Sequence, residues 1–218
     1  MLKRFSGFLG TAAIYGLLLL PLASIMRGGT VAYSIGTTTG NDASQFTFGF
    51  EFQANANILV TDLGIFDSSQ DGLADTHQVG IWTNSGTLLG SNTIPSGTTA
   101  PLLSQFRYEP LLVPIALTAG QNYVIGASYP TSNDSFVYHA SGLASDPDIS
   151  IIIGRGSGSG FSFPPVSCSA SIGCDTSFFG PNFQFTQTAD APEPGSLLLL
   201  LVSVVGLIGL SARRRQRA

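Results

Sequence analysis

In Gln45-Phe46-Thr47-Phe48-Gly49-Phe50-Glu51-Phe52 every second residue is a phenylalanine, and this alternation is the clearest structural signal in the chain. Successive side chains of a β-strand point to opposite faces, so the phenylalanines fall on one face at a period of two. The pattern predicts a strand whose aromatic face lies in a hydrophobic core. An aromatic binding stripe is the alternative interpretation, and core packing is the favoured one.

Similar short runs lie on both sides of this stretch, separated by turn clusters rich in Gly, Ser, Thr and Asn. They predict about nine or ten strands, the main ones within residues 58–66, 77–83, 87–94, 105–113, 122–129, 149–153 and 182–187. Glycines at every second position from 154 to 160 predict a mobile loop. We therefore expect an all-β, jelly-roll-like antiparallel β-sandwich. An N-terminal signal helix and a C-terminal transmembrane helix are expected to flank it.

The N-terminus has the features of a secretory signal peptide. Lys3 and Arg4 precede an apolar run over residues 5–22, and Thr30-Val31-Ala32 places small residues at the usual −3 and −1 positions. This predicts a signal peptide over residues 1–32, with cleavage after Ala32. An uncleaved anchor is the alternative.

The C-terminus combines three features in a fixed order. Pro192-Glu193-Pro194 precedes an apolar run over residues 197–210, and Arg213, Arg214 and Arg215 follow it. With the small residues beside it, this run gives about 16 to 18 residues and a helix of roughly 25 Å, close to the short limit for crossing a bilayer. The arginines should stay cytoplasmic, which places the rest of the chain outside. A plain anchor and a buried core helix are the alternatives.

This order of features resembles the PEP-CTERM sorting signal of exported bacterial proteins. The resemblance covers residues 192–217 and implies recognition by an exosortase, a membrane transpeptidase-like protease that would cut near Pro192-Glu193-Pro194. It also implies a Gram-negative host that makes exopolysaccharide and biofilm. The protein is then expected in the inner membrane through its C-terminal helix before processing, and afterwards at the cell surface or outside the cell. The expected division is signal peptide 1–32, sandwich domain 33–189 and sorting signal 190–218.

The central part resembles an uncharacterised β-sandwich domain that recurs in PEP-CTERM proteins. The resemblance implies a fold and an export route but no established activity. It is carried by Phe48-Gly49-Phe50-Glu51-Phe52, Leu63-Gly64-Ile65-Phe66-Asp67, Asp71-Gly72-Leu73, His77-Gln78-Val79-Gly80-Ile81-Trp82 and Leu117-Thr118-Ala119-Gly120-Gln121-Asn122-Tyr123.

Charge and cysteine content limit the partners. Residues 33–191 hold two arginines, Arg107 and Arg155, against twelve acidic residues, a formal charge of −10. This argues against nucleic acid, whose phosphates must be neutralised by basic side chains. Cys168 and Cys174 are expected to form one disulfide in an exported protein. A zinc site is disfavoured because no histidines lie near them.

One polar loop resembles a calcium loop in its spacing. Asp67, Ser69, Asp71 and Asp75 fall at positions 1, 3, 5 and 9, and glycine falls at position 6. The bidentate glutamate of position 12 is replaced by Gln78, and flanking helices are missing. No cofactor is otherwise expected. The alternative is a polar loop whose aspartates cap turns.

No catalytic residue is assigned, and the chain is expected not to be an enzyme. His77 and His139 are the only histidines, no Gly-x-Ser-x-Gly elbow is present, and Glu51 and Glu109 have no acidic partner nearby in sequence. We expect a structural surface or extracellular-matrix protein linked to exopolysaccharide. A calcium-assisted carbohydrate-binding module is the alternative, and a secreted hydrolase a minor one. Candidate sugar-binding rings are Trp82, Tyr108, Tyr129, Tyr138 and Phe161.

Overall fold

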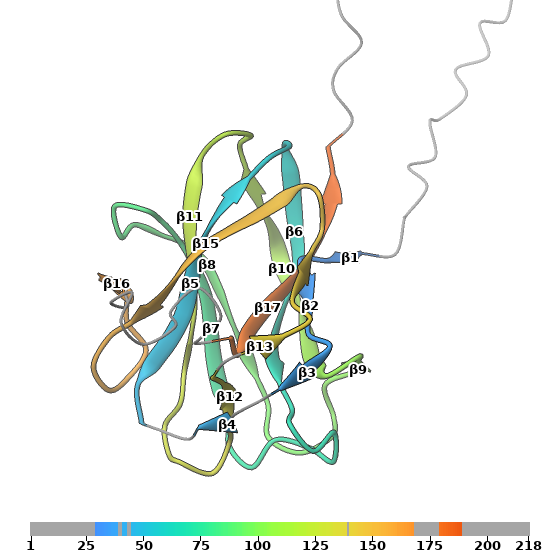
Figure 1. Cartoon of the computed structure of the whole chain (residues 1–218), viewed down its shortest axis with the longest axis vertical. Coiled ribbons are helices and arrows are strands. Elements are labelled where there is room, and N and C mark those ends of the chain that lie inside the picture. The colour runs from blue at the N-terminus through green and yellow to red at the C-terminus, as the bar shows by residue number, and fades with distance from the viewer. Residues whose placement is uncertain (1–28, 39–40, 43–44, 139, 168–178, 189–218) are drawn as a thin grey trace, which may run out of the picture.

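The computed structural model describes residues 29–38, 41–42, 45–138, 140–167 and 179–188. All regular secondary structure in these ranges is β-strand, and every strand pairing is antiparallel. The strands form two main sheets that pack face to face, with three two-stranded pairs beside them (Figure 1).

The strand order within each sheet follows from the backbone pairings. The five-stranded sheet has the order β1 (Thr30–Val31), β17 (Pro181–Gln187), β6 (Ile58–Phe66), β10 (Phe106–Leu117), β9 (Leu102–Leu103). The six-stranded sheet has the order β16 (Val166–Ser167), β15 (Ile149–Gly156), β5 (Thr47–Ala54), β11 (Asn122–Ser128), β7 (His77–Thr83), β8 (Leu88–Ile94). The small pairs are β2 (Tyr33–Ser34) with β14 (Ala144–Ser145), β3 (Thr37–Thr38) with β13 (Ala140–Ser141), and β4 (Asn41–Asp42) with β12 (Phe136–Val137).

Four strand pairs are nested along the chain. β7 pairs with β8, β6 with β10, β5 with β11, and β1 with β17, and successive pairs alternate between the two sheets. A ribbon of nested antiparallel pairs rolled into two sheets is the topology of a jelly roll. β15 is an addition that follows β11 and pairs with β5. The predicted jelly-roll-like antiparallel sandwich is therefore confirmed, while both predicted flanking helices lie outside the described residues.

The phenylalanines of β5 fill the space between the sheets, as their spacing predicts. Phe50 and Phe52 are fully buried. The Phe50 ring lies 5.4 Å from that of Tyr33, and the Phe52 ring lies 5.1 Å from that of Phe183 on β17. Burying one such side chain stabilises a fold by about 1.5–3 kcal/mol. Phe46 departs from the pattern because it precedes the strand and stays 44% exposed.

The opposite face of β5 meets a covering segment rather than solvent. Gly49, Gly126 and Gly80 lie in register across β5, β11 and β7. A methyl group at Gly80 would crowd Phe161, and one at Gly126 would crowd Pro164. The glycine row therefore makes room for the chain after β15 to lie against the sheet. β15 itself runs to Gly156, so part of the stretch predicted as a loop is a strand.

The first described residues belong to the sandwich. β1 pairs with β17, and the Ala32 amide donates a hydrogen bond to the Phe183 carbonyl at 2.9 Å. Ala32 is fully buried. Cleavage after Ala32 would remove this strand from the sandwich, and the cleavage site stays a prediction. Residues 1–28 lie outside the described part of the chain.

Candidate functional site

A buried histidine and aspartate join β7 to two loops. His77 is fully buried; its Nε2 lies 2.9 Å from Oδ2 of Asp134, and its Nδ1 lies 2.9 Å from the Ser128 carbonyl oxygen. The Asp134 carboxylate also accepts hydrogen bonds from the amides of Ala74 and Asp75, at 2.9 and 2.8 Å. Each ring nitrogen thus lies within hydrogen-bond distance of an oxygen, one of a carboxylate and one of the backbone. His77 thus holds loops together.

The electrostatics of this cluster follow from its hydrogen bonds. Burial raises the pKa of Asp134, but hydrogen bonds from His77 and from the Ala74 and Asp75 amides outweigh burial and leave this pKa below its usual value. The Tyr129 ring packs edge-on against His77, with centroids 5.1 Å apart. Burial, and then the Asp134 charge, raise the pKa of Tyr129.

The predicted calcium loop is organised around an arginine. Oδ2 of Asp67 accepts hydrogen bonds from Nε of Arg107 at 2.7 Å and from the Gly72 amide at 3.0 Å. Arg107 Nη1 donates to the carbonyls of Thr98 and Ala100, at 3.2 and 2.9 Å. Asp67 and Arg107 are 3% and 4% exposed. Arg107 was not assigned to this loop from sequence, because it lies 40 residues away.

The other three predicted calcium ligands have different surroundings. Asp75 accepts a hydrogen bond from the Thr131 hydroxyl, whereas Ser69 and Asp71 line a shallow hollow with Asp67. Within the described ranges, no three His, Cys, Asp or Glu residues are grouped so that they could hold a metal ion. The four predicted ligands are therefore not gathered around one point in this structure. Calcium binding at this loop stays a prediction.

A second ion pair, which is partly buried, lies on the outer face of the six-stranded sheet. Arg155 on β15 pairs through Nη2 with Oε2 of Glu51 on β5. The same Nη2 donates to Oδ1 of Asn84 at 3.1 Å, and Nδ2 of Asn122 donates to Oε1 of Glu51 at 2.9 Å. Gln53 Nε2 donates to Oδ1 of Asn122 at 3.3 Å. The ion pair therefore positions two asparagine side chains.

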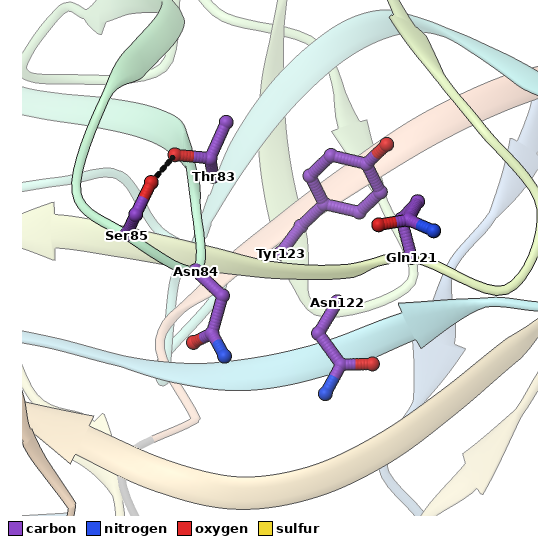
Figure 2. A pocket seen from close by; sticks show the side chains of 6 residues that line it. All are labelled: Thr83, Asn84, Ser85, Gln121, Asn122 and Tyr123. Carbon is purple, nitrogen blue, oxygen red and sulfur yellow. Dashed lines mark hydrogen bonds between the residues drawn. The ribbon is translucent and has the colours of Figure 1, made fainter.

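These asparagines line a hollow of about 440 Å³ at one end of the sandwich, here called the amide hollow. Its lining consists of Thr83, Asn84, Ser85, Gln121, Asn122 and Tyr123. Figure 2 shows the Asn84 and Asn122 side chains pointing the same way, with Tyr123 pointing away from them. The Thr83 and Ser85 hydroxyls are joined by a 2.9 Å hydrogen bond. The hollow offers amides and hydroxyls, and no charged side chain is in its lining.

Most candidate sugar-binding rings are core residues. Trp82, Tyr108 and Tyr129 are 4%, 3% and 1% exposed. Phe161 is half-buried and packs on Trp82 with ring centroids 5.1 Å apart, and Tyr138 is also half-buried. Alternation along strands turns these rings toward the interior or under the covering segment. The five candidates therefore do not form a row of solvent-facing rings.

Several predicted features lie outside the described residues. They are His139, the cysteines Cys168 and Cys174, and the sorting residues Pro192, Glu193, Pro194, Arg213, Arg214 and Arg215. The disulfide and the transmembrane helix therefore stay predictions. Within the described ranges, the chain contains no helix that is both apolar enough and long enough to cross a membrane.

Fold and site together define an all-β, jelly-roll domain with a polar, uncharged hollow at one end. Residues 34–162 match the family described as "Domain of unknown function (DUF4082)". The match spans more than half of the chain, and the chain belongs to this family. The predicted resemblance to an uncharacterised sandwich domain is thereby confirmed.

Residues 190–215 match the PEP-CTERM protein-sorting motif. The predicted sorting signal is confirmed, and it marks an exported protein that is processed by an exosortase. Before processing, its C-terminal signal is held in the membrane. No curated protein matches the chain.

Sequence reasoning missed the residues that organise these sites. Asp134, Arg107 and Arg155 act through partners far away in the chain, and the amide hollow brings together two turns. One feature of the sequence could have indicated these ion pairs. Residues 33–191 contain only two basic residues against twelve acidic ones. Because arginine is almost never buried unless it is paired, an arginine within a core strand is expected to have an acidic partner.

Proposed function

We propose that the mature protein is a non-enzymatic component of the cell surface or extracellular matrix, and that it associates with exopolysaccharide. The observation that carries the proposal is the sorting motif at residues 190–215, which follows the last described strand, β17, almost directly. A folded sandwich joined to a processing signal is suited to display or release outside the membrane.

The contacts of His77 support a role without catalysis. General bases and nucleophile partners need access to a substrate. His77 is fully buried and both its ring nitrogens bond to Ser128 and Asp134. This supports the structural role over the hydrolase, for which a histidine in an open cleft would be expected.

Fractionation of cells with and without the exosortase tests this proposal. With the exosortase, we expect a product that has lost the segment after Pro192-Glu193-Pro194, found in the matrix fraction with exopolysaccharide. Without it, or in a Glu193→Ala chain, the unprocessed protein should stay with the membrane. Intact-mass measurement identifies each product. A processed protein that is found only in the medium, in cells with a normal matrix, would contradict the association with exopolysaccharide.

Carbohydrate binding is the second candidate, and the amide hollow is the observation that favours it. The hollow lies at the Thr83 end of β7, whereas the Asp67–Asp75 loop lies near the His77 end. Six residue steps along a strand span about 20 Å. Calcium at that loop would therefore not contact a ligand in the hollow, so calcium dependence and glycan binding can be tested separately.

A further inference from the structure

Two amides of the hollow, those of Asn84 and Asn122, lie side by side on one face of the sheet (Figure 2). Asn122 pairs in register with Gln53 of β5, and Tyr123 pairs with Thr83 of β7, which places Asn84 beside Asn122. Neighbouring strands lie about 4.8 Å apart, so the three side chains form a polar row across β5, β11 and the end of β7. Gln121 adds an amide from the turn before β11, but its side chain points away from that of Asn122 and borders the hollow from the other side (Figure 2).

The side chains of Glu51 and Arg155 hold the two asparagines of this row in place. Asn84 uses its oxygen to accept from Arg155, and Asn122 uses its nitrogen to donate to Glu51. The two N–H groups of Asn84 then have no partner among the described residues, and neither does the side-chain amide of Gln121. Asn84 and Gln121 are both exposed. The hollow therefore presents fixed donors and one free amide that can both donate and accept.

The electrostatics of the hollow limit which classes of ligand it can bind. Glu51 and Arg155 neutralise each other beneath the surface, and the lining itself carries no ionised group. An anion would find no free cation, and the domain's formal charge of −10 would repel it. A cation would find no free carboxylate. A ligand rich in hydroxyl groups fits, because each hydroxyl both donates and accepts and amides do the same.

We propose that the amide hollow binds a neutral glycan through Asn84, Gln121 and Asn122. The inference rests on the proposed function, since it supplies the surface by which the protein would contact exopolysaccharide. Glu51 and Arg155 act as positioning residues that orient the two asparagines. Acidic polysaccharides are excluded from the hollow by charge.

Binding of defined polysaccharides to the full-length protein in detergent micelles tests the proposal. The probes are the neutral glycans dextran, laminarin and galactomannan, with the acidic polymer alginate as comparison, measured by calorimetry and affinity electrophoresis. We expect saturable binding of a neutral glycan and none of alginate. Gln121→Ala should weaken binding about tenfold, the effect of losing one well-formed hydrogen bond or two. Asn84→Ala should act in the same direction.

Gln78→Ala is the matched control, because Gln78 is an exposed glutamine on the same sheet but outside the hollow. Its binding should equal that of the unmodified protein, and all three variants should keep its melting temperature. Equal binding by Gln121→Ala and Gln78→Ala would overturn the site while leaving association with exopolysaccharide intact. Absence of binding to every neutral glycan would also overturn it. Loss of matrix association in the fractionation experiment would instead contradict the proposed function.

Discussion

Nε2 of His77 lies 2.9 Å from Oδ2 of Asp134, and this contact joins the start of β7 to a loop 57 residues further along the chain. Because Asp134 also accepts the Ala74 and Asp75 amides, a single carboxylate organises two loops at one end of the sandwich. The first prediction concerns this carboxylate.

Asp134→Asn should destabilise the protein near neutral pH. The substitution replaces one acceptor oxygen with an NH₂ group, which then faces the Ala74 or Asp75 amide without a bond. A buried polar group that loses its partner costs about 1–3 kcal/mol. Chemical denaturation at pH 7 measures the free energy of unfolding. An unchanged free energy of unfolding would contradict the role of Asp134 in joining the two loops.

Acid should remove the contribution of Asp134 in the unmodified protein. Its pKa is lower in the folded than in the unfolded state, so its stabilisation is complete above the unfolded value of about 4 and disappears as the pH falls through the folded value. The difference in melting temperature between the unmodified protein and Asp134→Asn should therefore shrink below about pH 4. A difference that grows in acid would show the opposite sign and refute this account.

Asp67→Ala should destabilise the protein equally in calcium and in chelator. The change leaves Arg107 buried without its carboxylate, and breaking a buried ion pair costs about 3–5 kcal/mol. Asp71→Ala is the control; this exposed residue should shift stability by no more than about 0.5 kcal/mol. A calcium-dependent rise in melting temperature that disappears in Asp71→Ala would instead establish calcium in the loop.

Gly49→Ala should be strongly destabilising, although alanine is small. A methyl group at Gly49 would overlap the Ile125 carbonyl oxygen of the neighbouring strand. Overpacking of this kind costs about 1–3 kcal/mol, and the backbone cannot move aside easily. Gly158→Ala is the matched comparison, because nothing lies within 4 Å of the added methyl. Thermal unfolding should separate the two variants, and similar melting temperatures would contradict the tight strand contact.

The mature N-terminus should lie before Thr30. β1 covers one edge of β17, and Ala32 bonds to Phe183 within the core. Edman sequencing or mass spectrometry of the exported protein identifies the cleavage point. A chain that lacks residues 30–32 should be less stable, because β17 becomes an exposed edge. A mature protein that begins at Tyr33 with undiminished stability would support cleavage after Ala32.

Strands could be predicted from the sequence where the alternation of residues within a short segment is clear. The alternation of Phe48, Phe50 and Phe52 identifies a core strand because one face is buried. Gly49 and Gly80 interrupt such strands for a reason that lies outside them, namely the close backbone of β11 and the ring of Phe161. The nested pairing of a jelly roll was expected in outline only, since strand order depends on contacts between distant segments.

The sites were harder to predict for the same reason. Spacing placed Asp67 and Asp75 in one loop, but their hydrogen-bond partners, Arg107 and Thr131, come from elsewhere in the chain. Solvent exposure of the aromatic residues also depends on the covering segment, which removes Trp82 from the surface. Sequence therefore located polar loops and rings correctly, but it could not assign their contacts.

The placement of both domain arginines within paired strands has a consequence for proteolysis. Trypsin-like proteases cut after arginine or lysine where the chain can enter their active site in an extended, mobile form. Between residues 33 and 191 the sequence offers them only Arg107, which is buried, and Arg155, which is half-buried, and both lie within strands and form ion pairs. Cleavage by these proteases should therefore require at least local opening of a strand. The scarcity of basic side chains thus leaves trypsin-like proteases few places to cut the folded domain.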